Sequence, residues 1–148
     1  GQLVGYPIVA IGDVIAYLRT IERAIITALA DAGVSARARP DEGPDFTGVW
    51  TGERKIASIG VHVSRGVTTH GFAINIDNDL EPFGWVVPCG LDGVRMTSVV
   101  QEAAVGSQGP ADVRAAIAPR FAEAFERSPR EIEAAVLDEL APAQPAPA

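Results

Sequence analysis

Two stretches decide the fold: Lys55-Ile56-Ala57-Ser58-Ile59-Gly60-Val61-His62-Val63 and His70-Gly71-Phe72-Ala73-Ile74-Asn75-Ile76-Asp77. In both, apolar residues alternate with small or polar ones, which is the period-two pattern of a strand with one buried face. A shorter strand, Val49–Thr51, precedes them. Turns at Gly52-Glu53-Arg54 and over residues 64–69 favour an antiparallel meander of the three strands.

The two faces of this meander differ in residue size. One face carries the apolar residues Ala57, Ile59, Val61, Val63, Phe72, Ile74 and Ile76. The opposite face carries Gly60, Gly71 and Ala73. Small residues in strands leave a trough or allow a close backbone approach. From these positions alone, a bulge or tight packing under a helix is the more economical explanation.

The segment before the meander is predicted to hold a strand, a helix and a loop. Leu3–Val9 is predicted as a strand, with Pro7 indicating an edge or a bulge. Asp13 is a predicted N-cap for a helix that ends at Gly33, with Arg19, Glu22 and Arg23 on its solvent side. Residues 35–48 are predicted to form a surface loop.

The second half of the chain reads as helices separated by turns. Ser98 and Gln101 have capping-box spacing for a short helix. Gly109-Pro110 opens a longer helix, which Pro119 is expected to kink or divide. Ser128-Pro129-Arg130-Glu131 predicts a last helix to about Leu140. We therefore expect one domain over residues 1–140 and a disordered Pro/Ala-rich tail over residues 141–148.

Composition narrows the classes of function. The chain has 148 residues, 47% of them hydrophobic, and a net charge of −7. A general nucleic-acid surface is not expected, because phosphate binding needs clustered Lys and Arg. No apolar run approaches the roughly 18 residues of a membrane helix. With one cysteine there is no internal disulfide and no multi-cysteine zinc site, which fits a reducing, cytoplasmic compartment. There is also no nucleotide-binding motif.

Cys89 and Lys55, the only cysteine and the only lysine, are the candidates for chemistry. Cys89 follows a short apolar run and sits between Pro88 and Gly90, a placement typical of an exposed turn. Taken singly, a structural cysteine and a solvated lysine are the better explanations. Two histidines are a weak metal signal, so no metal site is predicted. A Cys-His dyad with His70 as the base stays open.

An ordered set of motifs closely resembles the octanoyltransferases of lipoate biosynthesis. The set covers roughly Gly1 to Val100, and any one of its tripeptides would be weak evidence. Its members are Lys55-Ile56-Ala57-Ser58-Ile59-Gly60-Val61, Ser64-Arg65, Thr69-His70-Gly71-Phe72-Ala73-Ile74-Asn75, Asp79-Leu80, Phe83, Pro88-Cys89-Gly90 and Thr97-Ser98.

The resemblance implies an α/β (α+β) fold: a mixed, largely antiparallel sheet flanked by helices, similar to the lipoate- and biotin-protein ligase catalytic domains. It implies transfer of an octanoyl group from acyl carrier protein to a lysine of lipoyl domains, in 2-oxoacid dehydrogenase and glycine-cleavage proteins. No cofactor is expected. Arg54, Lys55 and Arg65 are candidates for a docking patch toward these acidic partners.

The resemblance also assigns residues. Cys89 would carry the acyl group as a thioester, and Lys55 would lower the pKa of Cys89 and shuttle protons. Six residues would line the acyl site: Ser58, Ile59, Gly60, Gly71, Phe72 and Ala73. His70 and Arg65 are supporting candidates.

The N-terminus departs from the family pattern. Gly1-Gln2 resembles the end of a His-Gly-Pro-Gly-Gln loop whose preceding segment is absent. We therefore expect an N-terminally truncated octanoyltransferase that is weakly active or inactive alone. The alternatives are an ATP-dependent lipoate-protein ligase-like amidotransferase, against which the Pro-Cys-Gly cysteine argues, and an inactive fragment that binds lipoyl domains.

Overall fold

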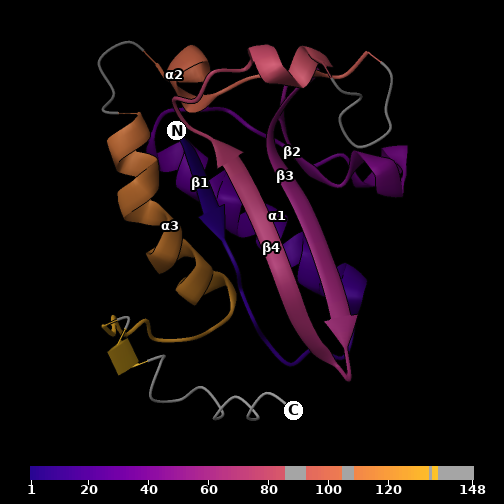
Figure 1. Cartoon of the computed structure of the whole chain (residues 1–148), viewed down its shortest axis with the longest axis vertical. Helices are drawn as coiled ribbons and strands as arrows, with labels where there is room; N and C mark the ends of the chain where they lie inside the picture. The colour runs from indigo at the N-terminus through magenta and orange to yellow at the C-terminus, as the bar shows by residue number, and fades with distance from the viewer. Residues whose placement is uncertain (86–92, 105–108, 134, 137–148) are drawn as a thin grey trace, which may run out of the picture.

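The predicted meander is present in the computed structural model, which describes residues 1–85, 93–104, 109–133 and 135–136 (Figure 1). It consists of β2 (Gly48–Thr51), β3 (Arg54–Ser64) and β4 (Val67–Asn75), paired antiparallel. The β3–β4 register places Gly60 opposite Gly71 and Ser58 opposite Ala73. The tight turn between β3 and β4 contains Gly66, whose φ of 79° suits a residue without a Cβ.

Two further strands complete the sheet. The N-terminal strand β1 (Gln2–Gly5) pairs antiparallel with β4 at one edge, and β5 (Arg95–Met96) pairs parallel with the start of β3. The sheet is therefore mixed and largely antiparallel, as expected. β1 is shorter than the predicted Leu3–Val9 strand: Pro7 has no N–H to donate, and regular pairing stops before it.

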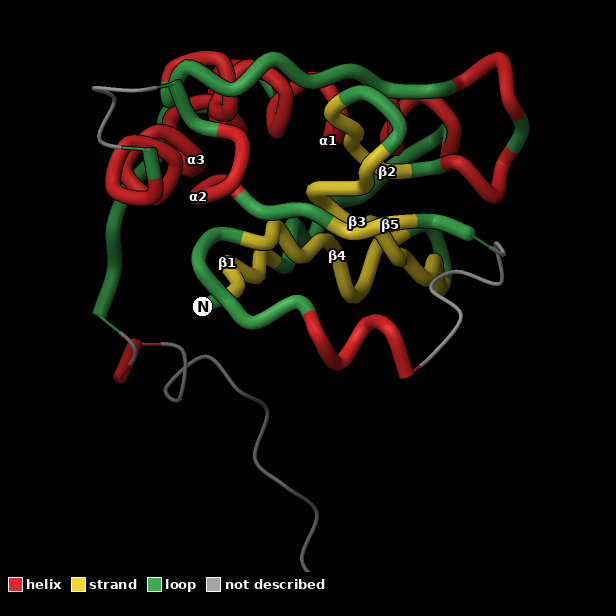
Figure 2. The backbone as a smooth tube through the Cα atoms, turned by 90° about the horizontal axis from the view of Figure 1, so that it is seen from above, coloured by secondary structure: helices red, strands yellow, loops and turns green. Residues whose placement is uncertain are grey.

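Helices cover one side of this sheet. Figure 2 shows α1 (Val14–Asp31) and α3 (Pro110–Ala124) on the same side of the strands, and the 3-10 helix η3 (Glu81–Trp85) on the other. Asp13 caps α1 as predicted, because its carboxylate accepts from the Ala16 N–H at 3.0 Å. The core between helices and sheet includes Ile21, Ile25, Leu29, Val49, Ala57, Phe72, Ile74 and Val113.

Shorter elements join these layers. Residues 35–48 contain two 3-10 helices, η1 (Pro40–Glu42) and η2 (Pro44–Phe46). The short helix predicted at Ser98 is α2 (Val99–Glu102). Among the described residues, no helix combines the length and the apolar character needed to cross a bilayer.

Three local expectations are wrong. Glu22 is buried rather than on the solvent side, because its carboxylate accepts a hydrogen bond from a backbone N–H inside the fold. Pro119 does not divide α3, which runs through it, and a kink at Pro119 stays a prediction. The predicted last helix does not begin at Ser128: residues 128–133 are not helical and their side chains are exposed, whereas residues 135–136, within the predicted span, are helical. Residues 137–140 and the predicted disordered tail lie outside the described residues.

Candidate active site

A hollow of about 500 Å³ lies on the sheet where the small residues of β3 and β4 meet. Five of the six residues predicted to line an acyl site border it: Ser58, Gly60, Gly71, Phe72 and Ala73. Val4, Tyr6, Val61 and His70 complete the lining. The sixth residue, Ile59, instead packs against the core.

The two paired glycines of the hollow are small for different reasons. A Cβ added at Gly71 would lie 2.1 Å from the carbonyl oxygen of Gly5, so Gly71 is needed for the close approach of β1 to β4. At Gly60, no described atom lies within 4 Å of such a Cβ. The packing explanation therefore accounts for Gly71, while Gly60 leaves open space above β3.

Phe72 and His70 border the hollow in unlike ways. The Phe72 ring is stacked on Phe121 of α3, with ring centroids 4.8 Å apart, so this residue also anchors the helix layer. His70 is exposed, and its φ of 64° departs from the extended conformation of its neighbours. His70 and its neighbour Gly71 both line the hollow. No group of three or more metal-ligating side chains is gathered in the described part of the chain.

Lys55 lies on the same strand, three residues before Ser58, which is about 10 Å along an extended chain. Its side chain is only 1% exposed, so it is not the solvated lysine that sequence reasoning favoured. The Lys55 Nζ lies 5.3 Å from the centre of the Trp50 ring. A Cβ added at Gly48 would lie 2.6 Å from the Lys55 Cε, so the bare Cα of Gly48 makes room for the lysine side chain.

The expected docking patch is wrong. Lys55 is buried, whereas Arg65 lies in the exposed turn at the far end of β3, roughly 30 Å away along the strand. Arg54 pairs with Glu102 at 2.9 Å. These three residues do not form one surface, because the extended strand separates them and the fold covers Lys55.

A polar network missed by sequence reasoning fixes the backbone at Lys55. The Thr97 N–H donates to the Lys55 carbonyl oxygen at 3.0 Å. The Asn75 side-chain amide donates to the Thr97 carbonyl oxygen, also at 3.0 Å. Both Asn75 and Thr97 are buried. Both residues belong to the ordered motifs, which was the only sign of this network in the sequence. Their hydrogen-bond partners are backbone groups, and only the fold brings these close.

Cys89 lies outside the described residues, as does the rest of the segment 86–92. On its two sides, η3 and β5 border a hollow of about 270 Å³, lined by Leu80, Phe83, Gly84, Val94, Arg95 and Met96. Met96 pairs with Lys55 across the parallel strands. The strand that follows the segment 86–92 therefore lies beside the lysine.

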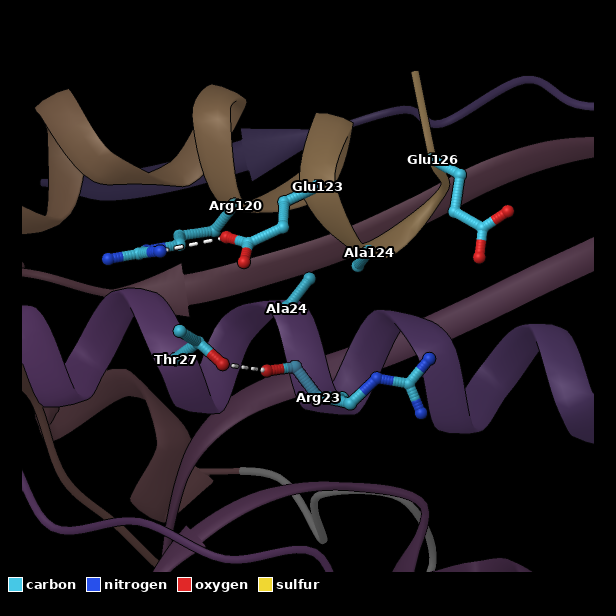
Figure 3. A pocket seen from close by; sticks show the side chains of 7 residues that line it. All are labelled: Arg23, Ala24, Thr27, Arg120, Glu123, Ala124 and Glu126. Carbon is cyan, nitrogen blue, oxygen red and sulfur yellow. Dashed lines mark hydrogen bonds and ion pairs between the residues drawn. The ribbon is translucent and has the colours of Figure 1, made fainter. Parts of the chain in front are cut away.

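Another hollow, of about 290 Å³, lies in the helix layer between α1 and α3 (Figure 3). None of the predicted site residues lines it. Arg120 there donates to Asp31 of α1 at 2.8 Å and to Glu123 at 2.8 Å. The hydrogen bond from Arg120 is the main reason that the pKa of Asp31 is lowered. This ion-paired cluster joins the two helices.

Comparisons with known proteins agree with the fold and the motifs. Residues 1–122 match the family model described as the lipoyl protein ligase A/B catalytic domain. An octanoyltransferase of Solibacter usitatus is 47% identical over 131 residues, covering 86% of this chain and 54% of the relative. One of Desulfovibrio desulfuricans is 46% identical over 129 residues, covering 84% and 51% respectively. The chain thus spans about half the length of the curated relatives it matches.

The fold has solved counterparts. A putative lipoate protein ligase of T. acidophilum has a TM-score of 0.65 and 23% identity, covering 88% of this chain and 52% of that one. At this identity the likeness shows the fold alone, and it confirms the expected ligase-like architecture. The chain belongs to the lipoyl protein ligase A/B catalytic domain family.

Proposed function

We propose that this chain carries the acyl site of an octanoyltransferase, which moves an octanoyl group from acyl carrier protein to a lysine of a lipoyl domain. The observation that carries the proposal is the hollow on β3 and β4. Gly60 lies in its lining and faces open space, and the buried Lys55 lies on the same strand. The identity to curated octanoyltransferases supports the acyl group and the reaction class.

In the first half-reaction, the Cys89 thiolate attacks the thioester carbonyl of the octanoyl donor. The new bond joins the Cys89 sulfur to the acyl carbon, and the bond to the carrier thiol breaks. The Lys55 ammonium gives its proton to the departing thiolate, which leaves as a thiol. An ammonium beside a cysteine favours the thiolate, the nucleophilic form.

In the second half-reaction, the amine of the acceptor lysine attacks the Cys89 thioester. An amide bond forms, the sulfur–carbon bond breaks, and Cys89 returns to the thiolate. The neutral Lys55 amine takes the proton that the attacking amine loses, so that both groups regain their starting states. One thioester is exchanged for another before the amide forms, and this sequence requires no nucleotide.

The remaining assignments are part of the same proposal. Ser58, Gly60, Gly71 and Ala73 would form the floor under the octanoyl chain, and His70 would border its open side. The partners would be octanoyl-acyl carrier protein and the lipoyl domains of 2-oxoacid dehydrogenase and glycine-cleavage proteins. The reaction would take place in the cytoplasm without a cofactor.

The test is mass spectrometry of the chain after incubation with octanoyl carrier protein, without ATP. The expected result is one added octanoyl group, gained more slowly than by a full-length relative, that is absent in Cys89→Ala and passes to a lipoyl domain when that acceptor is added. The control is Arg127→Ala, a change at an exposed position outside the hollow, which should acquire the same adduct.

Two other results would replace the proposal. Octanoylation or lipoylation of the acceptor that requires ATP, with no adduct on Cys89, would indicate a ligase-like amidotransferase, in keeping with the ligase fold. Binding of lipoyl domains without any adduct would indicate a non-catalytic binding module.

A further inference from the structure

Three charged side chains are buried among the described residues: Glu22, Arg39 and Lys55. Arg39 is paired with Glu42 and with Glu53. Lys55 belongs to the proposed site. Glu22, on α1, has no part in the proposed reaction, and burying a carboxylate is costly unless hydrogen bonds compensate it.

The Glu22 carboxylate is held from two directions. Its Oε1 accepts from the Gly48 N–H at 3.1 Å, across 26 residues of sequence. Its Oε2 accepts from Arg19, one helical turn earlier, at 2.5 Å. The bond to Gly48 attaches α1 to the first residue of β2, the strand whose Trp50 pairs with Lys55.

Gly48 connects this carboxylate to the lysine. Its φ of +139° lies in the region that favours glycine, and an added Cβ would lie 2.6 Å from the Lys55 Cε and 3.3 Å from its Nζ. The lysine side chain therefore lies against the Cα of Gly48. Any movement of the Gly48 backbone would change the space that the end of this side chain occupies.

We infer that Glu22 is a positioning residue for Lys55: its carboxylate fixes the Gly48 backbone, and Gly48 fixes the end of the lysine side chain. The inference rests on the proposed function for its catalytic meaning, because Lys55 must place its amine where protons are exchanged. Displacing a reacting group by about 1 Å can lower a rate by roughly a hundredfold. The contacts themselves can be tested without any turnover.

The single lysine makes the test direct. Lysine labelled with ¹³C at Cε gives NMR signals from Lys55 alone, because the chain has no other lysine. A fixed side chain gives its two Hε protons distinct chemical shifts, and a mobile one averages them. Four variants are compared: Glu22→Leu, Glu22→Asp, Glu22→Gln and Arg19→Gln.

Glu22→Leu removes the acceptor, and Glu22→Asp withdraws it by one methylene while keeping the charge. Both should shift the Lys55 Cε signal and bring the two Hε shifts together. Glu22→Gln keeps an oxygen that can accept from Gly48 and should resemble the parent chain. Arg19→Gln removes the ion pair but not the bond to Gly48, and should cause the smaller change. If Glu22→Leu fails to fold, Glu22→Asp decides.

An unchanged Lys55 signal in folded Glu22→Leu or Glu22→Asp would overturn the inference, as would a shift in Arg19→Gln as large as theirs. Kinetics give the second readout: kcat for acyl transfer should fall by about tenfold or more in Glu22→Asp, with KM for the donor nearly unchanged. If Lys55 proves unnecessary for transfer, the proposed function fails in its lysine role. The NMR result would still decide whether Glu22 fixes the side chain.

Discussion

The two faces of the β3–β4 pair serve different purposes although the same two strands build them. On the helix side, Ala57 and Ile74 are fully buried against α1 and its neighbours. On the opposite side, Ser58, Gly60 and Ala73 floor a hollow of about 500 Å³. Bulky side chains therefore lie where they stabilise the domain, and small ones lie where a ligand would need space.

Mutations on the two faces should therefore have separable effects. Changes on the helix side should lower stability and alter acyl transfer only through folding. Changes on the hollow side should alter acyl binding while leaving stability nearly unchanged, except at Gly71, which packs against β1. Lys55 stands apart, because it lies near the start of β3, before the residues that border the hollow.

The largest effect is expected at Lys55. Lys55→Met keeps a long side chain in the buried site but removes the ammonium, so acyl transfer should fall by about 10²- to 10⁴-fold. The unfolding temperature of the variant is the second quantity, which separates the loss of the ammonium from a loss of the fold. Single-turnover transfer and thermal unfolding measure the two quantities. Lys55→Arg keeps the charge but should impair proton transfer. Normal transfer by Lys55→Arg would exclude the acid–base role.

A large loss of stability is expected on the helix side at Ile74. Ile74→Ala should lower the free energy of unfolding by about 2–5 kcal/mol, because Ile74 is fully buried and pairs with Leu3 and Ala57. Urea unfolding measures this loss. The matched control is Val4→Ala at the rim of the hollow, where the side chain is 51% exposed and the loss should be small. Equal losses at both positions would break the distinction between the faces.

The two paired glycines, Gly60 and Gly71, should differ in their effect on stability. Gly71→Ala should cost about 1–3 kcal/mol of stability, since its Cβ would overlap the Gly5 carbonyl oxygen. Gly60→Ala should leave stability within about 0.5 kcal/mol, because its Cβ enters open space.

Gly60→Leu extends the same series by filling that space. It should raise KM for the octanoyl donor by about tenfold, or roughly 1.4 kcal/mol, at little cost in stability. Steady-state kinetics with octanoyl carrier protein provide the measurement. Unchanged KM in a folded Gly60→Leu protein would show that the acyl chain lies elsewhere.

The smallest effect concerns the junction between the covering helices. The pKa of Asp31 is lowered, first by its hydrogen bond to Arg120. The stability from this pair is therefore complete above the ordinary aspartate pKa of about 4 and is lost as the pH falls through the lower pKa of the folded state. Asp31→Asn should flatten the dependence of unfolding free energy on pH below about pH 4. Identical slopes in the two proteins would show that this pair contributes nothing to acid sensitivity.

The alternation of residues was sufficient to predict the meander and its two faces. For the small residues it favoured tight packing over a trough, and the structure shows packing at Gly71 but open space at Gly60. The same local logic located Asp13 as a helix cap, because the cap and its partner, Ala16, are three residues apart. This local logic placed Glu22 wrongly, because the group that donates a hydrogen bond to its carboxylate is a backbone N–H 26 residues away. It left Lys55 on the surface for a related reason: Gly48 and Trp50, which enclose it, belong to another strand.

The most direct test of the distinction between the faces is where the acyl chain lies once the protein is acylated. NMR of the chain carrying a ¹³C-labelled octanoyl group on Cys89 would measure NOEs from the acyl protons to surrounding residues. The account predicts NOEs to the Gly60 Hα and the Ala73 methyl group. NOEs instead to Leu3, Ile117 and Phe121, which line a separate hollow of about 320 Å³ between β1 and α3, would contradict it.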